Sequence, residues 1–488
     1  MNLKPTTMLE QAKKVLAANG HSLYAPYQLD GVRKLLINET LYKHHRGGLL
    51  CDEMGLGKTI QMISLILGNL VDQTLIVMPM SLIQQWINEI KKFTGDTFEI
   101  VVFHGTDRNL IDLSIKEKPQ IVLTSYGLMS RNYNSKLHQI KWDRIISEEC
   151  HLIRNHKSRT SRSMCLLRSK YKWGITGTPV HNSLKDLTSI CKFLGFDPLY
   201  VRAYTKDIVR KYVLRRTKLD VSRFNQKLNL PDKVVELFNI KYKTEQEKQF
   251  YHSIKKKIDK KIQRLTQLNI NNTIFYLEML LRMRQAAILP QLVIEGLNKK
   301  FKTNDSNWLG SNTKLDFISS KVLKLKDVER PIIFTQFNSE MLYLYNKLKA
   351  KMRIELINGS ISMIDRANII QRAHTITDKD DKNYIDCLII QIDAGGTGLN
   401  LQMFDSVWFS TITWNPAIEM QAIARVHRIG QQKRVKIRKV IMEDTIESRI
   451  IEVQNKKIQI MIDVLEDPNI RSKTINKLSL NTIKKLLN

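Results

Sequence analysis

The chain has few cysteines, and none of them are paired in the sequence. Five cysteines stand apart among 488 residues, with no CxxC pair, so neither a zinc ribbon nor a disulfide framework is supported. This usage favours a reducing environment. The N-terminal MNLKPTTMLEQAKK lacks the apolar core of a secretory signal, and no later run reaches about 18 apolar residues. We therefore expect an intracellular protein that is not inserted in a membrane.

Acidic residues are scarce relative to basic ones. Lys and Arg together number 78 against 47 Asp and Glu, a formal net charge of +31. Such a surface attracts polyanions, which makes nucleic acid the leading partner class. A generally solvated basic surface is the alternative, because net charge specifies neither fold nor chemistry. At a prior of ~150 residues per domain, the length predicts about three units or two large lobes.

Short runs of branched apolar residues recur between stretches with helical spacing. They occur at 74–79, 121–126 and 144–149, and in a second series at 331–337, 354–359, 386–392, 406–412 and 435–441. Such alternation is typical of strand–helix units in a largely parallel sheet. The sequence therefore predicts an α/β fold with two lobes.

The region between the two series is rich in Lys and has apolar residues at helical spacing, which predicts helices that bridge or decorate the lobes. The polar segment KFKTNDSNWLGSNTK that follows is typical of a linker or loop. We predict a first lobe at 1–235, a helical insertion at 236–299, a second lobe at 300–460 and a C-terminal helical brace at 461–488.

The segment DEMGLGKT, from Asp52 to Thr59, lies between an apolar strand and a helix with apolar periodicity. This is the context of a phosphate-binding loop, in which amides at the helix N-terminus hold the phosphates. Lys58 would reach the β and γ oxygens, Thr59 would help hold magnesium, and Gly55 and Gly57 would permit close approach. The usual GxxxxGK[ST] pattern has Gly where Asp52 stands. The alternative is a simple helix start, which the flanking strand and helix disfavour.

The segment WDRIISEECHLIRN ends a predicted strand in two carboxylates, Glu148 and Glu149. Phosphoryl transfer needs one acid near magnesium and another group that orients the attacking water. We assign Glu148 to magnesium and Glu149 to the water. Alone, such a pair is usually surface charge, and its place after the phosphate loop favours the catalytic interpretation.

Taken together, these motifs resemble helicase superfamily two, in the branch of SWI/SNF-type DNA translocases and chromatin remodellers. The segment EECH resembles the Asp-Glu-x-His box of this branch, with the longer Glu148 at the first acid. The resemblance extends from about residue 24 to 487, with the motifs in the family's order. It implies two RecA-like lobes with parallel sheets, helical insertions between them, ATP and magnesium as cofactors, and DNA-dependent ATP hydrolysis.

The resemblance also assigns residues of the first lobe. YAPYQLDGVRKLL resembles the adenine-recognising glutamine motif and nominates Gln28. LIVMPMSLIQQWINEI resembles a segment that meets the DNA backbone, which nominates Pro79. IVLTSYGLM continues the pattern, and its Thr124, Ser125 and Tyr126 would touch DNA phosphate through hydroxyls or backbone amides.

Three further segments resemble pieces of this branch. GITGTPVHNSLKDL resembles the third motif, which couples hydrolysis to lobe movement, and its polar turn would contact the His151 region. VLRRTKLDV at 213–221 is a piece that simpler helicases lack. LLRMRQAAILPQL at 280–292 is also similar, and we interpret it as structural.

In the second lobe, QIDAGGTGLNLQMF resembles the fifth motif, with Gly396 letting the backbone approach the nucleotide or DNA. WNPAIEMQAIARVHRIGQQKRV closely resembles the sixth. Its Gln421, Arg425 and Arg428 fall at i, i+4 and i+7, which predicts one helical face. The two arginines would stabilise charge on the γ-phosphate. An isolated RxxR would instead indicate a solvated basic face.

The expected function is therefore an ATP-dependent double-stranded DNA translocase that remodels or displaces protein–DNA complexes, nucleosomes among them. One alternative is a transcription termination or release ATPase that works with an RNA polymerase. The poxviral nucleoside triphosphate phosphohydrolase resembles this branch too, and the richness in Lys, Ile and Asn fits a large DNA virus. A catalytically weak DNA-binding scaffold and a strand-separating helicase are the others. The expected location is the nucleus, a viral factory or a virion.

Overall fold

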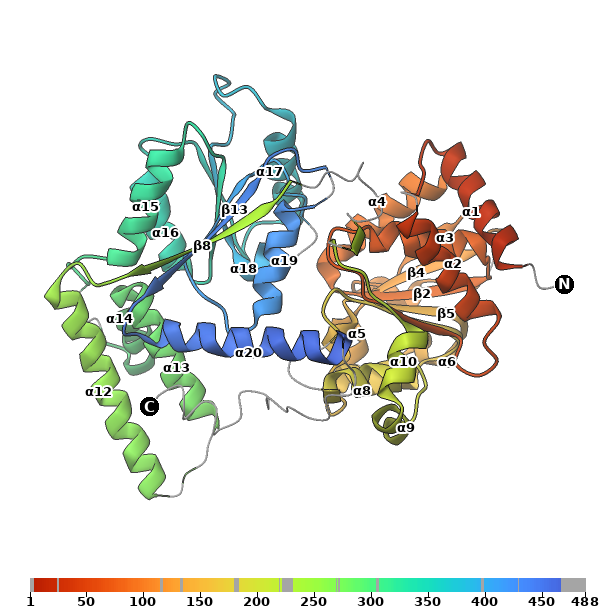
Figure 1. Ribbon diagram of the computed structural model, residues 1–488, viewed down its shortest axis with the longest axis horizontal. Coiled ribbons are helices and arrows are strands. Elements are labelled where there is room, and N and C mark those ends of the chain that lie inside the picture. The colour runs from red at the N-terminus through yellow and green to blue at the C-terminus, as the bar shows by residue number, and fades with distance from the viewer. Residues whose placement is uncertain are drawn as a thin grey trace. The chain divides into compact units, whose positions relative to one another are not determined.

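The computed structural model describes residues 4–23, 26–114, 117–131, 135–179, 184–218, 220–221, 231–268, 270, 273–303, 307–395, 399–428 and 430–466. They form two compact units. One contains the described residues up to 221 together with 459–466, and the other contains the described residues from 231 to 458 (Figure 1). Each unit is a parallel sheet covered by helices. The predicted α/β fold with two lobes is confirmed.

The first unit is built on a seven-stranded sheet in which every pairing is parallel. In sheet order the strands are β3 (Glu99–Val102), β4 (Gln120–Ser125), β2 (Gln73–Met78), β5 (Lys141–Glu148), β6 (Arg168–Ile175), β1 (Gly47–Leu50) and β7 (Val213–Leu214). All three strands predicted from apolar runs in this half are present. Their central residues are buried on both faces, which explains why these strands read as continuous apolar runs.

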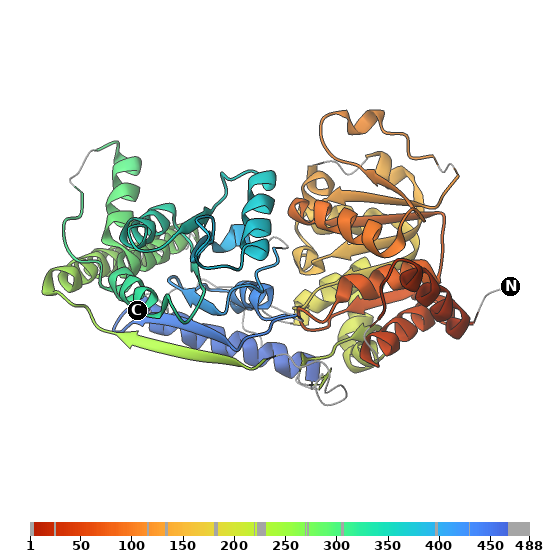
Figure 2. The same cartoon turned by 90° about the horizontal axis from the view of Figure 1, so that it is seen from above.

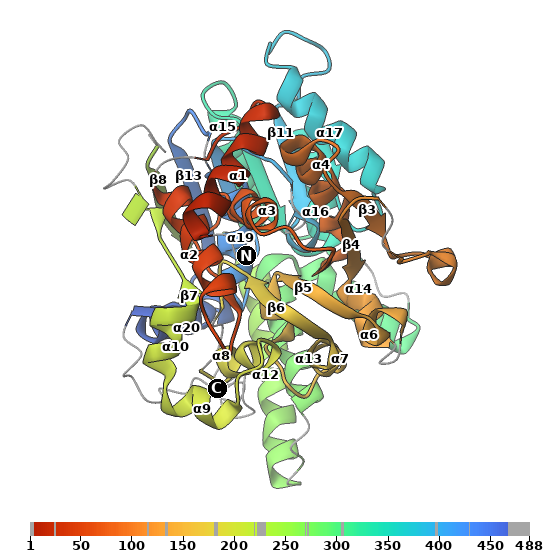
Figure 3. The same ribbon diagram turned by 90° about the vertical axis from the view of Figure 1, so that its right-hand side faces the viewer.

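Helices cover both faces of the first sheet (Figure 3). Alternate residues of β2 show the division, because Ile76 joins one core and Leu75 the other. The Ile76 core includes α1 (Pro5–Ala18), α2 (Tyr27–Thr40), α3 (Lys58–Gly68) and α4 (Ile83–Thr94). The Leu75 core includes α5 (Tyr126–Arg131), α6 (Lys136–Gln139), α7 (Arg159–Leu166), α8 (Leu184–Phe193), α9 (Pro198–Ala203) and α10 (Thr205–Tyr212). Short 3-10 turns lie at η1 (Met80–Leu82), η2 (Asp107–Leu110) and η3 (Cys150–Ile153).

The second unit has a six-stranded sheet, again parallel throughout. Its order is β10 (Ile354–Ile357), β11 (Cys387–Gln391), β9 (Pro331–Thr335), β12 (Ser406–Phe409), β13 (Val435–Met442) and β8 (Lys233–Ile240). The five strands predicted here are confirmed. The edge strand β8 was not predicted, and Figure 2 shows it running beside β13.

Strand β8 corrects the prediction that the chain is helical from residue 236, because it extends to Ile240. Its residues alternate between exposed and half-buried, since it pairs on one side only, with β13. It therefore lacks the apolar run that marks the inner strands. It also begins at Lys233, inside the range expected for the first lobe. The ranges predicted for the insertion and the brace stay predictions, and residues 467–488 of the brace lie outside the described residues.

The helices of the second unit also form two layers. One core includes α15 (Thr313–Leu325) and α16 (Asn338–Leu348) together with the start of α14 (Pro290–Phe301). The other includes α12 (Glu245–Gln267), α13 (Thr273–Ile288), α17 (Met363–Thr375), α18 (Ile392–Gly395), α19 (Pro416–Val426) and the start of α20 (Ile446–Glu466). Helices α12, α13 and α14 confirm the predicted helical content between the two strand series. Among the described helices, none is both long and apolar enough to cross a membrane.

Candidate functional site

The carboxyl edge of the first sheet gathers most of the predicted site residues. Because all strands are parallel, their carboxyl ends lie along one edge. In sheet order this edge carries Tyr126 after β4, Pro79 after β2, Glu148 at the end of β5 and Thr176 after β6. The phosphate loop follows β1. The residues predicted for DNA thus follow two neighbouring strands, β4 and β2. The residues predicted for ATP and magnesium follow β5 and β1, and the predicted coupling turn follows β6 between them.

The predicted phosphate loop ends on a left-handed glycine that begins a helix. Gly55 and Gly57 have φ of 91° and 74°, a backbone region that other residues enter at a cost. Helix α3 starts directly afterwards at Lys58, with Thr59 in its first turn. Lys58 Nζ donates to the carbonyl oxygen of Asp52 at 3.0 Å. The loop therefore presents helix N-terminal amides and a lysine, which together suit an anionic ligand.

Asp52 was predicted to take part in cofactor binding, and the structure corrects this for its side chain. The carboxylate is wholly buried and turned into the lobe. Arg216 Nε donates to Asp52 Oδ1 at 3.0 Å, and its Nη2 contacts Oδ2. Gln61 Nε2 donates to Oδ2 at 3.1 Å. The carboxylate is thus committed to neighbours at the base of the loop and is not placed to contact a nucleotide.

Residues 213–218, which we call the strap, run beside the phosphate loop. The backbone N–H of Cys51 donates to the Leu214 carbonyl at 2.7 Å, and that of Glu53 donates to the Arg216 carbonyl at 2.8 Å. The N–H of Lys218 donates to Glu53 Oε2 at 2.8 Å. The sequence identified the strap only as a segment typical of the branch. It gave Arg216 no role, because its partners are distant in the chain.

Gln28 lies beneath the same loop. Its side chain is 1% exposed, and its Nε2 donates to the Leu56 carbonyl at 3.1 Å and to the Tyr27 hydroxyl at 3.2 Å. A Cβ added at Gly57 would lie only 2.4 Å from this nitrogen. Gln28 therefore supports the loop backbone directly. Its predicted contact with adenine stays a prediction.

The two acids occupy different backbone positions. Glu148 is the last residue of β5, and the Tyr126 hydroxyl donates to its carbonyl at 2.7 Å. Glu149 has left-handed φ and ψ of 50° and 48°. Such a conformation costs a non-glycine residue on the order of 1 kcal/mol or more and is enriched at functional positions. The strained backbone position therefore falls on the second acid, directly after the end of β5.

His151 links the second acid to the neighbouring strand end. Its Nδ1 lies 3.2 Å from Glu149 Oε2 and 3.1 Å from Thr176 Oγ1. The Thr178 N–H donates to the same Thr176 hydroxyl at 3.2 Å. The predicted contact between the GITGTP turn and His151 is confirmed. The His151 imidazole therefore connects the Glu149 carboxylate directly to the turn after β6.

The side chains predicted to touch DNA are buried, which corrects part of that prediction. Thr124, Ser125 and Tyr126 are all buried. Thr124 Oγ1 donates to the Phe103 carbonyl at 3.0 Å, and the Tyr126 hydroxyl lies 2.6 Å from Ser147 Oγ. Burial raises the pKa of Tyr126 well above its ordinary value. These hydroxyls form hydrogen bonds inside the lobe. The contact with DNA through the backbone amides and Pro79 stays a prediction.

In the second unit, helix α19 carries two of the three residues predicted to share a face. Gln421 and Arg425 lie on α19, which ends at Val426. Arg428 follows in the turn beyond the helix, so the predicted common helical face of all three is wrong. Gly396 lies outside the described residues.

The early end of α19 has a specific cause. Gln431 Nε2 donates to the Val426 carbonyl at 3.2 Å and to the Gln402 carbonyl at 2.9 Å. His427 leaves helical geometry, and its Nε2 lies 2.7 Å from the Pro231 carbonyl. The Gln431 side chain thus takes up the carbonyl of the last helical residue, and Arg428 lies in the turn that follows.

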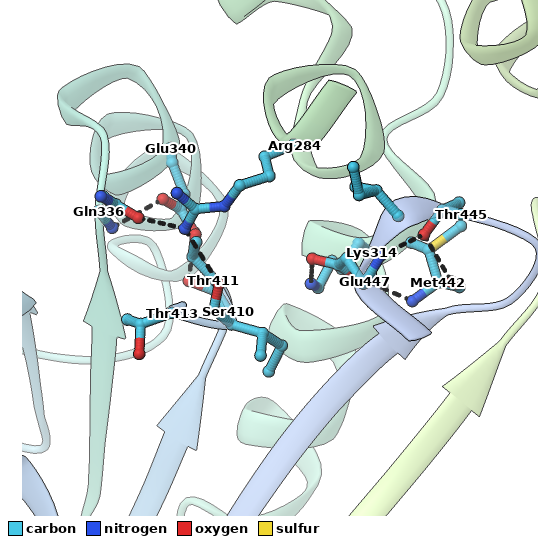
Figure 4. Close-up of polar contacts among 12 residues, drawn as sticks. Arg284, Lys314, Gln336, Glu340, Ser410, Thr411, Thr413, Met442, Thr445 and Glu447 are labelled. Atoms are coloured by element: carbon cyan, nitrogen blue, oxygen red, sulfur yellow. Dashed lines mark hydrogen bonds and ion pairs between the residues drawn. The ribbon is translucent and has the colours of Figure 1, made fainter. Parts of the chain in front are cut away.

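The carboxyl edge of the second sheet is held by a buried polar cluster (Figure 4). Arg284 reaches from α13 to Gln336 Oε1 at 2.5 Å and to the Ile412 carbonyl at 3.0 Å. Glu340 accepts from the Ser410 and Thr411 hydroxyls. Burial lowers the pKa of Arg284. The segment 280–292, interpreted as structural from its sequence, thus anchors the loop that leads from β12 into α19.

Comparison with known proteins decides the family. The sequence matches the SNF2-related domain over residues 27–291 and the helicase conserved C-terminal domain over residues 313–430. The chain belongs to the SNF2-related family. The first match covers the whole first sheet and continues into the second unit through β8, α12 and α13, and the second match covers β9 to β12.

Three SNF2-related proteins illustrate the similarity. YwqA of Bacillus subtilis, of the ATP-dependent helicase/translocase type, is 30% identical over 91% of this chain and 49% of its own length. The ISWI chromatin-remodeling complex ATPase ISW1 of Saccharomyces cerevisiae is 28% identical over 89% and 40%. Transcription termination factor 2 of Drosophila melanogaster is 26% identical over 88% and 56%. The chain spans about half the length of these curated relatives.

The residues at the first carboxyl edge fit the cofactors that the SNF2-related family implies. The α3 N-terminus and Lys58 suit a triphosphate. Thr59 and Glu148 offer the hard oxygen donors that magnesium prefers. Within the described residues, no group of three or more His, Cys, Asp or Glu could form a metal cage. Magnesium is usually held by one or two carboxylates together with substrate phosphates.

Proposed function

We propose that this chain is an ATP-dependent translocase on double-stranded DNA that displaces or remodels protein–DNA complexes. The observation that carries the proposal is the first carboxyl edge. There a phosphate loop, two carboxylates and the His151–Thr176 contact lie on adjacent strands of an SNF2-related domain. The helicase C-terminal match and the net charge of +31 add support for a nucleic-acid motor.

Each residue then has a chemical task. The α3 amides and Lys58 would bind the phosphates, and Thr59 and Glu148 would hold magnesium, which would neutralise charge on the transferred phosphoryl group. Glu149 orients the attacking water and accepts its proton. Arg425 and Arg428 supply positive charge to the transition state, and Gln421 assists from the same helix as Arg425. The His151–Thr176 contact transmits a movement of the Glu149 side chain to the turn after β6.

The proposed partner is the phosphate backbone of duplex DNA, so binding should be salt-sensitive and weakly sequence-specific. The nucleus, or a viral factory or virion, is the proposed location. ATPase rates compared with duplex DNA, single-stranded DNA, RNA and nucleosomes test the proposal. We expect strong stimulation by duplex DNA, lost in Lys58→Ala and Arg428→Ala and kept in the exposed control Lys43→Ala. Stimulation by RNA alone would contradict it.

A second candidate is a termination or release ATPase acting on RNA polymerase. The similarity to transcription termination factor 2 favours it. This candidate differs from the first in the complex that is displaced from DNA, which would be RNA polymerase. A stalled transcription complex is therefore the appropriate substrate for its test. ATP-dependent transcript release without nucleosome movement would select this candidate. Absence of ATP turnover with every nucleic acid would leave a DNA-binding scaffold.

A further inference from the structure

Helix α12 has two contrasting faces. Its inner face packs into the core of the second unit through Tyr251, Ile254, Ile258, Ile262 and Leu265. Its neighbour α13 lies along it (Figure 1). At 100° per residue, the direction opposite this apolar stripe falls close to Lys260. The outward face is therefore fixed by the packing of the inner one.

The exposed surface of α12 between residues 256 and 264 is strongly basic, with Gln263 as a neutral residue among the cations. We call its cations the basic ridge, which consists of Lys256, Lys257, Lys260, Lys261 and Arg264. All five are exposed, and none forms an ion pair with a described residue. Lys261 lies at the edge of this surface that faces α13, with its Nζ 5.8 Å from the centre of the Phe275 ring. The only acid within this span, Asp259, points between the ridge and the buried face. Five like charges in nine positions repel one another, so the ridge favours a dense negative partner.

The base of α12 is held firmly. Thr244 caps the helix by accepting from the Glu247 N–H at 3.4 Å. Glu247 is 1% exposed and accepts from the Thr313 N–H at 3.1 Å. The Tyr251 hydroxyl accepts from the Ile446 N–H at 2.8 Å. The ridge is therefore presented on a pre-organised support, which lowers the ordering cost of binding.

We propose that the basic ridge of α12 is a second contact surface for duplex DNA, separate from the carboxyl edges of the two sheets. From Lys256 to Arg264 the helix rises ~12 Å. A duplex carries one charge per about 1.7 Å of axis, or ~7 phosphates over this length. Five cations without hydrogen-bonding specificity match this repeating charge. The inference relies on the proposed function only in taking duplex DNA as the ligand.

The ridge would add grip that does not depend on the nucleotide state. Its lysines and arginine lie on the helical insertion and not at the predicted ATP residues. Binding there would hold the duplex to the second unit while the ATP cycle proceeds. The ridge should therefore affect DNA affinity and processivity, and leave the DNA-independent ATPase rate unchanged.

The test replaces all five ridge residues with Gln and measures duplex DNA binding by fluorescence anisotropy between about 50 and 200 mM salt. We expect affinity at low salt to fall at least ~10-fold. The slope of log K against log salt should become shallower by about 2 to 4, because each lost phosphate contact removes roughly 0.9. Equal melting temperatures would show that the variant is folded.

A matched control separates a site from general charge. Five exposed lysines of the same unit, changed to Gln, remove the same charge elsewhere, namely Lys324, Lys326, Lys349, Lys351 and Lys379. We expect this control to alter the slope by less than half as much. Equal effects in both variants, or an unchanged slope in the ridge variant, would overturn the proposal. Wild-type protein that binds DNA without stimulation of its ATPase rate would instead overturn the proposed function. The contribution of the ridge to DNA affinity could still be measured in that case.

An acidic protein partner is the competing occupant. It predicts that the ridge variant keeps the wild-type salt slope for DNA and loses binding to an acidic polypeptide such as poly-glutamate. That pattern would also overturn the DNA assignment.

Discussion

Arg216 and Asp52, 164 positions apart, form a buried ion pair at the base of the phosphate loop, with Nε 3.0 Å from Oδ1. The Arg216 guanidinium also donates to Gln61 Oε1 at 2.7 Å and contacts the Tyr27 carbonyl. One side chain of the strap thus ties together the loop, the start of α2 and the helix α3 that follows the loop. Asp52, which stands where the usual phosphate-loop pattern has glycine, is the residue that pairs with Arg216.

Arg216→Met should destabilise the first unit by roughly 3–5 kcal/mol, because it leaves the buried Asp52 carboxylate without its partner. Denaturant unfolding followed by hydrogen exchange in β1 measures the loss. The double variant Arg216→Met with Asp52→Asn should recover part of it, since no buried charge remains. Arg33→Met, which breaks an exposed pair with Asp30, should cost at most about 1 kcal/mol. No recovery in the double variant would show that the ion pair is not the cause.

Glu149→Gln should reduce duplex-stimulated ATP turnover by about 10² to 10⁴, because the amide cannot accept the proton of the attacking water. ATP affinity should stay within about threefold of wild type, because Lys58 and the α3 amides are unchanged. Single-turnover hydrolysis and binding of a fluorescent ATP analogue separate the two effects. Glu10→Gln on the exposed face of α1 is the matched control. A large loss of ATP binding would mean that Glu149 acts in nucleotide binding instead.

His151→Ala and Thr176→Val should each lower the DNA-stimulated ATPase rate and leave the basal rate nearly unchanged. The reason is that the contact joins Glu149 to the turn after β6 without belonging to the phosphate loop. A double-mutant cycle on the stimulated rate should show a coupling of about 0.5–3 kcal/mol. Additive effects would show that the two residues act independently.

The second unit should weaken in acid through Glu329. Burial alone would raise the pKa of this carboxyl, but hydrogen bonds from Arg438 and Lys436 outweigh it and lower the pKa from 4.5 to about 2. A depressed native pKa stabilises the ionised form. The stabilisation is therefore complete above pH 4.5 and is lost as the pH falls towards 2, and screening by solvent reduces it to about 1–2 kcal/mol.

Hydrogen exchange of the β12 and β13 amides between pH 2 and pH 5 measures this effect in the intact chain. Glu329→Gln should remove that part of the pH dependence, because the amide does not titrate. Glu443→Gln, whose contact with Lys241 is largely exposed, should leave it in place. An unchanged acid profile in Glu329→Gln would contradict the assignment.

Local pattern was enough for much of the fold and for the identity of the candidate site. The inner strands of both sheets follow from apolar runs that are buried on two faces, as in 74–79 and 386–392. The phosphate loop and the Glu148–Glu149 pair follow from residue types at fixed spacing. These features depend on neighbours in the chain, so the sequence by itself determined them.

Tertiary structure decided the features that depend on distant partners. Asp52 became a support instead of a ligand because Arg216 is folded against it. Arg428 left the helical face because the Gln431 side chain captures the Val426 carbonyl. Strand β8 formed only because β13 offers it a parallel edge. In each case a buried charge or an unsatisfied backbone group had to find a partner, and only the folded chain fixes which residue supplies it.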